Sequence, residues 1–203
     1  MRLVLDWDGT VTERDTLELV IESFGDMATY RRTGELMGTA MTHDEALECS
    51  FATVRSPLGD VVARLLADVR VRAGFHELVE RHRPLVVSSG FCELIEPVLR
   101  REGVDVELIA NNVEPRPDGW RIRFRELPPC AECGERCKRA SLPAGEFAYA
   151  GDGYSDRCPA LAATLVFATG ALAPWLERRG VAYEPFEDFH DLLATLDGEV
   201  VDR

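Results

Sequence analysis

The sequence RLVLDWDGTV, residues 2–11, contains a short apolar run followed by two carboxylates, a glycine and a threonine. The apolar run is typical of a buried β-strand, and Gly9 permits a tight turn directly after it. Asp6 and Asp8 therefore lie at the end of the predicted strand. Binding and catalytic groups gather at the carboxyl ends of strands in parallel sheets, so this pair is a candidate functional site.

Three more segments have the same character: PLVVSSG at 84–90, EFAYAGDG at 146–153 and TLVFATG at 164–170. Helical patterns such as FHELVERH, CELIEPVLRREG and APWLERRG separate or follow them, with apolar residues at three- and four-residue spacing. This alternation predicts an α/β fold with a doubly wound, Rossmann-like parallel sheet.

Residues 13–72 interrupt the alternation, because they contain helical patterns and no clear strand. We expect a helical cap inserted after the first strand, with residues 1–12 and 73–203 forming the core. A Pro-Asp-Gly turn between two alternating runs also predicts a β-hairpin at about 107–125.

Other polar residues follow the predicted strands. Asp152 and Asp156 come after EFAYA, and Ser88 and Ser89 end LVVSS. Carboxylates that converge on one edge of a sheet raise one another's pKa unless a cation is present, and Mg²⁺ is the oxygen-seeking counter-ion we expect. Hydroxyls at the start of a helix suit a phosphate group.

The ordered set DWDGT, SSGF, Lys138 and GDGYSD resembles the four motifs of the haloacid dehalogenase superfamily, and the predicted cap resembles that of its phosphoserine-phosphatase-like branch. The resemblance implies that Asp6 forms an aspartyl-phosphate and that Asp8 acts as general acid and base. It also implies that Lys138 stabilises charge. The implied phosphate-binding residues are Thr10, Ser88 and Ser89, and the implied metal-binding residues are Asp6, Asp8, Asp152 and Asp156.

The charges of these groups agree with a metal-dependent phosphatase. Four ionised carboxylates and one ammonium leave three net negative charges, which repel a phosphate monoester. Mg²⁺ reduces the excess to one, and a proton on Asp8 removes it. The predicted enzyme class is a phosphoric monoester hydrolase that acts on a small phosphorylated metabolite.

The substrate is less well defined by the motifs. Phosphoserine phosphatases place a Glu after the nucleophile to meet the substrate ammonium, and this chain has Asp15 there. They also use a cap arginine, whereas Ser50 stands at that position here and Arg55 follows it. The stretch PCAECGERCK resembles the phosphatases of methionine salvage, which act on 2-hydroxy-3-keto-5-methylthiopentenyl-1-phosphate. Phosphoserine phosphatase is the alternative, and a catalytically silent phosphate-ligand sensor is an alternative of another class.

The same stretch contains Cys130, Cys133 and Cys137, whose spacing permits three thiolate ligands to a structural zinc ion with a fourth from elsewhere, such as Cys158. A reduced turn or an incidental disulfide are the competing interpretations. His43 lies in the predicted cap without ligand spacing, so a surface or core role is favoured for it, and contact with the substrate is the alternative.

Composition limits the remaining possibilities. The 203 residues carry a net charge of −13, which argues against binding to nucleic acid or to an anionic membrane. The N-terminus has no secretory apolar region, so we expect a cytoplasmic protein, either a monomer or a homodimer. Lys138 is the only lysine among 23 basic residues, and it lies where the predicted chemistry requires one.

Overall fold

The computed structural model describes residues 1–198, so residues 199–203 of the predicted core lie outside the described part. In residues 1–198, seven strands form one sheet in the order β4-β3-β2-β1-β5-β6-β7. Their bounds are β1 Arg2–Leu5, β2 Leu85–Phe91, β3 Glu107–Glu114, β4 Arg121–Arg123, β5 Phe147–Gly151, β6 Leu165–Ala168 and β7 Glu184–Pro185.

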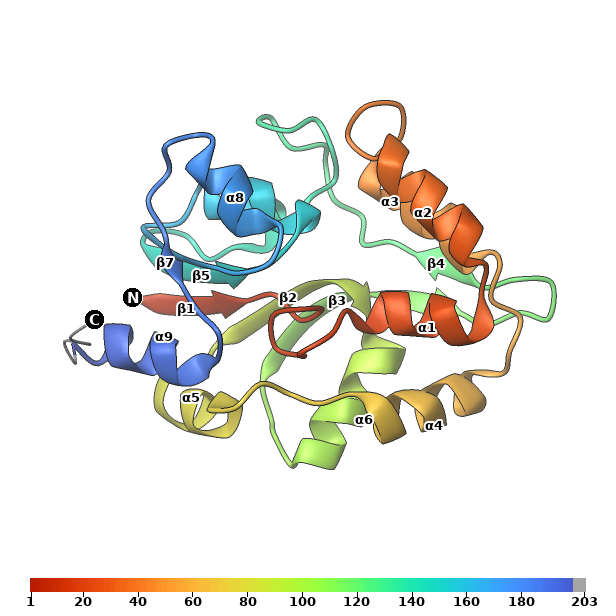
Figure 1. Ribbon diagram of the computed structural model, residues 1–203, viewed down its shortest axis with the longest axis horizontal. Coiled ribbons are helices and arrows are strands. Elements are labelled where there is room, and N and C mark those ends of the chain that lie inside the picture. The colour runs from red at the N-terminus through yellow and green to blue at the C-terminus, as the bar shows by residue number, and fades with distance from the viewer. Residues whose placement is uncertain (199–203) are drawn as a thin grey trace.

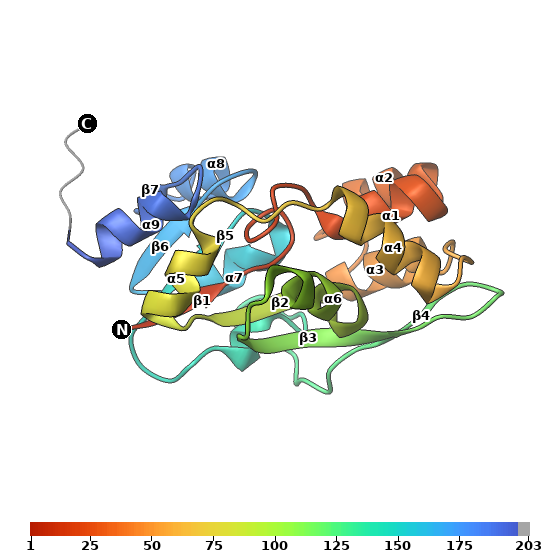
Figure 2. The same cartoon turned by 90° about the horizontal axis from the view of Figure 1, so that it is seen from below.

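The sheet is parallel except at one edge. β1 lies between β2 and β5 and pairs with both in parallel, while β4 is antiparallel to β3. Helices cover both faces, with α4, α5, α6 and α9 on one side and α7 and α8 on the other (Figures 1 and 2). The predicted doubly wound α/β fold is confirmed.

The helices follow the strands in chain order. Their bounds are α1 Thr16–Phe24, α2 Met27–Leu36, α3 His43–Phe51, α4 Leu58–Asp68, α5 Phe75–His82, α6 Cys92–Glu102, α7 Arg157–Ala160, α8 Leu172–Glu177 and α9 Phe189–Leu196. Two short 3₁₀ helices, η1 Lys138–Ser141 and η2 Tyr154–Asp156, lie next to β5.

The central strand is buried on both faces. Leu3 and Leu5 of β1 join the larger apolar cluster, whereas Val4 between them joins the smaller cluster beneath α7 and α8. This follows from the alternation of side chains along a strand. The rigid packing on both sides fixes the direction in which the chain leaves β1 toward Asp6.

Helices α1 to α4 fall within residues 13–72, and we call them the cap helices. Leu17 of α1 and Val61 of α4 belong to the same apolar cluster as Leu3 and Leu5 of the sheet. α2 and α3 pack against each other and stand over the carboxyl ends of the strands (Figure 1). The cap helices therefore share one core with the sheet, and α2 and α3 face the ends of its strands.

A hairpin in the predicted 107–125 region contacts the cap. β3 pairs in parallel with β2 and antiparallel with β4, so one strand serves both the main sheet and the hairpin. Trp120, at the start of β4, is buried, stacks on Phe51 of α3 and donates its indole N–H to the Ser56 carbonyl over 2.9 Å. A Cβ on Gly119 would lie 2.1 Å from the Ala52 oxygen, so only glycine permits this close approach.

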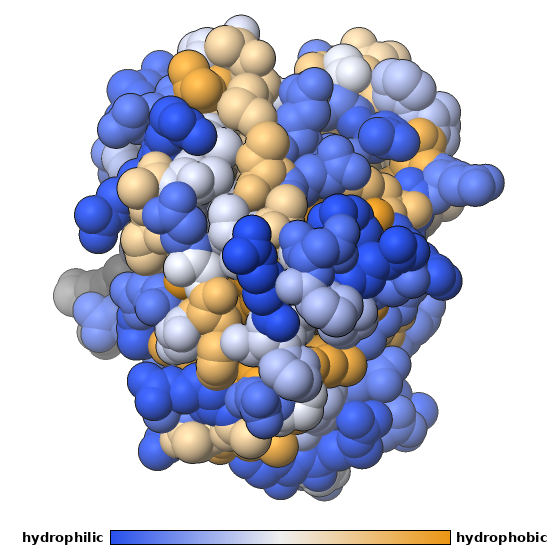
Figure 3. All heavy atoms as spheres, turned by 90° about the vertical axis from the view of Figure 1, so that its right-hand side faces the viewer, coloured by the Kyte–Doolittle hydropathy of each residue, from blue (hydrophilic) through white to orange (hydrophobic). Residues whose placement is uncertain are grey.

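The outer surface is mainly polar. Figure 3 looks at the side that carries α1 and the hairpin tip, where hydrophobic residues are interspersed among hydrophilic ones. Among the described residues, the large apolar side chains that are exposed are Met1, Leu36 and Leu161. In the same part of the chain, every helix is too short or too polar to cross a bilayer.

Candidate active site

The two acidic pairs meet because β1 and β5 are neighbours. Leu5 pairs with Ala150, so the residues that follow each strand leave the sheet side by side. Carboxylate oxygens of Asp6, Asp152 and Asp156 lie within 4.8 Å of one another. Three of the four carboxylates expected to converge therefore meet, whereas the Asp8 carboxylate lies outside this cluster.

Gly9 allows this convergence. Its φ of +74° is in the left-handed region, and a Cβ there would lie 2.4 Å from an oxygen of Asp152. A larger residue would push the first acidic loop away from the second.

Lys138 lies among these carboxylates and is 2% exposed. Its Nζ donates to Asp6 Oδ1 and, over 2.7 Å, to Asp156 Oδ1. The two carboxylates hold the pKa of this ammonium above its ordinary value, although burial acts in the opposite direction. Lys138 is therefore a fixed positive charge on the carboxylate of Asp6.

Asp156 is fully buried and has four donors. Besides Lys138, it accepts from the Tyr149 hydroxyl at 2.6 Å and from the backbone N–H groups of Asp152 and Gly153 at 3.0 and 2.9 Å. Burial opposes ionisation of this carboxyl, but Lys138 and the other donors hold its pKa below the ordinary value. Asp156 thus orients Lys138 and the loop that carries Asp152.

Asp8 is held from two sides. Thr16 at the start of α1 donates both its hydroxyl and, over 3.1 Å, its backbone N–H to Asp8 Oδ1. Ser88 donates to the other oxygen over 3.4 Å. Thr16 was not among the predicted site residues; its position one residue after the helix cap Asp15 is the sequence signal that could have identified it.

Burial and mutual repulsion raise the pKa values of the carboxyl groups of Asp6, Asp8 and Asp152. Burial, with the charge of Asp156, raises the pKa of Asp6 to about 7. Burial, with the charges of Asp15 and Asp6, raises the pKa of Asp8 to about 8. Burial, with Asp6 and Asp156, raises that of Asp152 to about 9. The protein alone lacks the positive charge needed to hold all of them ionised at neutral pH.

The predicted phosphate-binding hydroxyls occupy different depths. Thr10 is buried and donates to Asp6 Oδ2 over 3.4 Å, and Ser88 is buried against Asp8. Ser89 lines the cavity above them. Of these three residues, only Ser89 lines the cavity, whereas Thr10 and Ser88 lie buried against Asp6 and Asp8.

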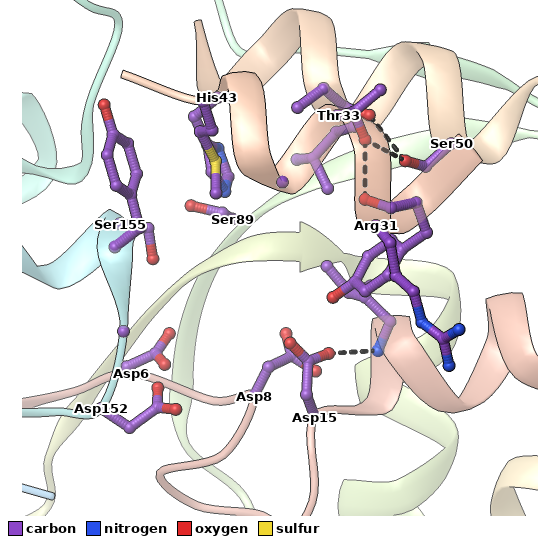
Figure 4. A pocket seen from close by; sticks show the side chains of 18 residues that line it. Asp6, Asp8, Asp15, Arg31, Thr33, His43, Ser50, Ser89, Asp152 and Ser155 are labelled. Carbon is purple, nitrogen blue, oxygen red and sulfur yellow. Dashed lines mark hydrogen bonds between the residues drawn. The ribbon is translucent and has the colours of Figure 1, made fainter. Parts of the chain in front are cut away.

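A cavity of about 250 Å³ lies between the carboxylates and the cap helices. Figure 4 shows Asp6, Asp8, Asp15 and Asp152 on one side and residues from α2 and α3 on the other. One oxygen of Asp15 caps α1 by accepting from two backbone N–H groups. The cap side is largely apolar and consists of Leu17, Tyr30, Gly34, Met37, Ala46 and Leu47, with Arg31, Thr33, His43 and Ser50.

Comparison with known proteins identifies the family. Residues 3–160 match the model of the haloacid dehalogenase-like hydrolases. The chain belongs to this family. The resemblance drawn from the sequence motifs is thus confirmed.

Relatives and solved structures agree with the family. The 2-hydroxy-3-keto-5-methylthiopentenyl-1-phosphate phosphatase of Bacillus mycoides (strain KBAB4) is 26% identical to this chain, over 97% of this chain and 95% of the relative. The phosphatase of the same name from Geobacillus kaustophilus (strain HTA426) is 28% identical, over 96% of this chain and 94% of the relative. A phospho-aspartyl intermediate analogue of phosphoserine phosphatase superposes with a TM-score of 0.68 at 17% identity, covering 95% of this chain and 97% of the other.

The phosphoserine phosphatase from T. onnurineus in complex with NDSB-201 gives 0.69 at 20% identity, covering 96% and 93%. These structural likenesses show the shared fold. The phosphatase names of the relatives agree with the predicted enzyme class, a phosphoric monoester hydrolase.

In this haloacid dehalogenase-like hydrolase, His43 lies where it could contact a substrate, the less favoured of the roles expected for it from the sequence. It lines the cavity and stacks on Tyr154, with ring centroids 6.1 Å apart and planes at 9°. Burial, with the nearby Lys138 charge, lowers its pKa to about 4, so its imidazole is neutral. The backbone N–H of His43 and the Tyr154 hydroxyl both donate to Glu135, at 3.1 and 2.9 Å. Glu135 therefore joins the cap to the core.

The predicted cysteine cluster also assembles. The sulfur atoms of Cys130, Cys133, Cys137 and Cys158 lie within 4.8 Å of one another. Cys49 and Cys92 belong to α3 and α6.

Proposed function

We propose that the protein is a Mg²⁺-dependent phosphatase that hydrolyses a small phosphorylated metabolite through an aspartyl-phosphate on Asp6. The observation that carries this proposal is the placement of Asp6, which meets Lys138 on one side and opens on the other toward a cavity shared with Asp8 and Asp152. A carboxylate beside a fixed ammonium is a suitable nucleophile for phosphorus, because the ammonium offsets charge in the transition state.

The residues divide the reaction into two balanced steps. A carboxylate oxygen of Asp6 attacks phosphorus, and the ester oxygen leaves with a proton donated by Asp8. A water molecule then attacks phosphorus and gives its proton to Asp8, which releases inorganic phosphate and restores Asp6. The raised pKa of Asp8, about 8, keeps it protonated for the first step. Ser89 lines the cavity that would receive the phosphate, while the buried Thr10 and Ser88 hydrogen-bond to Asp6 and Asp8.

The acidic cluster fits Mg²⁺, because its carboxylates exceed the single ammonium and their pKa values are raised in its absence. Asp6, Asp152 and the backbone carbonyl of Asp8 would hold the ion. The four hydrogen bonds to Asp156 assign it a supporting role. Mg²⁺ supplies charge neutralisation for the phosphoryl group.

The cap side of the cavity favours 2-hydroxy-3-keto-5-methylthiopentenyl-1-phosphate as substrate. Leu17, Met37 and Leu47 form an apolar wall suited to a methylthioalkyl chain. At Ser50, where phosphoserine phosphatases have an arginine, the hydroxyl bonds to the Ala46 carbonyl at 2.8 Å and lies 3.3 Å from the Thr33 hydroxyl.

Phosphoserine remains the second candidate because Arg31 lines the same cavity and could meet a carboxylate. The two substrates respond differently to Arg31→Met. If the thioether compound is the substrate, its kcat/KM changes less than about threefold. If phosphoserine is the substrate, loss of a charged partner costs about 1.5–3 kcal/mol, or roughly 10- to 100-fold in kcat/KM. A metabolite panel with wild type and this variant decides between them.

We expect turnover to depend absolutely on a divalent cation. Without a cation, the carboxylates either repel an incoming dianion when ionised or, when protonated, leave Asp6 a poor nucleophile, so hydrolysis of p-nitrophenyl phosphate should fall to background in excess chelator and return when Mg²⁺ is added. Full turnover in chelator contradicts the mechanism. Phosphate-ester binding without turnover in Mg²⁺ would instead favour the silent sensor.

Stability should also depend on pH and metal together. In the metal-free protein, Asp6, Asp8 and Asp152 have pKa values of about 7, 8 and 9, above the ordinary 3.8. Because the folded state binds their protons more tightly, their contribution to stability is complete below pH 3.8 and is lost as pH rises through 7 to 9. The rise in Tm on adding Mg²⁺ should therefore be larger near pH 9 than near pH 4. An equal or larger rise at acidic pH contradicts this expectation.

A further inference from the structure

Four cysteine sulfurs converge at a distance that suits a shared metal ion. All four lie within 4.8 Å of one another, and Cys130 Sγ is 3.7 Å from Cys158 Sγ. A disulfide would need about 2.05 Å. A tetrahedron with Zn–S bonds of about 2.3 Å has edges of about 3.8 Å. The distance between the sulfur atoms of Cys130 and Cys158 is therefore that expected for two ligands on one zinc ion.

The segment that carries three of these cysteines is an irregular surface segment, held mainly by polar contacts of Arg125, Glu135 and Arg136. Residues 124–137 form neither helix nor strand, and none of them is buried. Loops of this length without secondary structure are uncommon and are usually functional or disordered. The chain nevertheless makes a defined turn, in which Gly134 N–H donates to the Cys130 carbonyl at 2.8 Å and Cys130 N–H donates to the Glu135 carbonyl at 2.9 Å.

The surroundings of the sulfurs resemble those of a bound thiolate. The guanidinium of Arg139 lies 4.0 Å from the sulfur of Cys158. Four thiolates on a divalent ion carry two net negative charges, which a nearby guanidinium helps to offset.

We propose that Cys130, Cys133, Cys137 and Cys158 bind one structural Zn²⁺ ion as a closed four-thiolate site. Soft thiolates in tetrahedral geometry favour zinc over Mg²⁺, so the two metal sites of this protein would not compete. Four protein ligands leave no open position, which assigns the ion a structural role.

The location of the site gives zinc a second consequence. Cys137 directly precedes Lys138, and Cys158 follows Asp156 by two residues. One ion would therefore join the segment that contains Lys138 to the segment that contains Asp156. These two residues form the buried ion pair. Glu135, which lies between two ligands, contacts His43 and Tyr154, so the same ion would fix the contact between cap and core. Zinc would act here as a positioning element for Lys138.

The test measures metal content and coordination. Protein produced with added zinc and purified under a thiol reductant should contain one zinc per chain by mass spectrometry of the metal. Cys133→Ser and Cys158→Ser should each lose most of it. Cys49→Ser is the matched control, because Cys49 is an exposed thiol of α3, and it should retain zinc. Co²⁺ added to the apoprotein should give the charge-transfer and intense visible bands of tetrahedral thiolate coordination.

Several results would overturn the proposal. These are zinc well below one per chain in the wild type, full zinc in Cys158→Ser, iron in place of zinc, or a Cys130–Cys158 disulfide in freshly purified protein. If the serine variants fail to fold, the Co²⁺ spectrum of the wild-type chain decides, and octahedral bands alone overturn the assignment. None of these results bears on Asp6, whose role is tested by turnover.

Discussion

Asp6→Asn should abolish phosphatase turnover, by at least ~1,000-fold in kcat, in a protein that remains folded. The amide matches the carboxylate in size but is a far weaker nucleophile toward phosphorus. Asp6 is 4% exposed beside Asp156, and burial raises its pKa to about 7. Removal of its charge therefore relieves repulsion in the metal-free protein.

The Tm supplies an independent check on Asp6→Asn. Because the wild-type carboxyl loses its contribution to stability as pH rises through about 7, the metal-free variant should be at least as stable as wild type at pH 8. Asp60→Asn, an exposed change in α4, is the control and should retain full activity. Turnover of Asp6→Asn within tenfold of wild type would contradict the assignment of the nucleophile.

Lys138→Arg should lower kcat by about 100-fold, the scale of removing one preorganised charge donor from an active site. A guanidinium retains the charge, but its planar fork cannot place one donor on both Asp6 Oδ1 and Asp156 Oδ1 as the ammonium does. The site is 2% exposed, so the larger side chain should also cost about 1–3 kcal/mol through overpacking. Steady-state kinetics and a thermal melt measure the two effects separately.

The control for Lys138→Arg is the reverse substitution, arginine to lysine, at an exposed position. Arg64 is half exposed and pairs with Asp68 in α4, so Arg64→Lys should leave kcat unchanged. Near-normal kcat in Lys138→Arg would remove the ammonium from the mechanism. A variant that does not fold is replaced by Lys138→Met, for which the same loss of kcat is expected.

The sequence was sufficient to predict the sheet and its acidic edge. RLVL and EFAYAG are short apolar runs ending in Asp6 and Asp152, and parallel pairing of β1 with β5 brings such ends together. The alternation with helices was sufficient to predict a parallel, doubly wound sheet, but not the order of its strands or β7. These features depend on local patterns and on general rules of topology.

Features that depend on packing between distant segments were not predicted. α2 has a weak pattern, MATYRRTGEL, with one buried residue, Thr33, and its helix is supported by α3. α9 lies in an acidic tail, but Phe189 and Leu192 pack it into the core near α5. The contact of Glu135 with His43 spans 92 residues, and no local pattern could have indicated it.

The most direct test of the aspartyl-phosphate uses Asp8→Asn with p-nitrophenyl phosphate. This leaving group needs little protonation, so Asp6 can still be phosphorylated, whereas hydrolysis of the intermediate loses its base. We predict a burst of p-nitrophenolate approaching one per active site, and a phosphoryl group on the peptide that contains Asp6 after acid quench. A burst without that modification, or a phosphoryl group on another residue, would contradict the account.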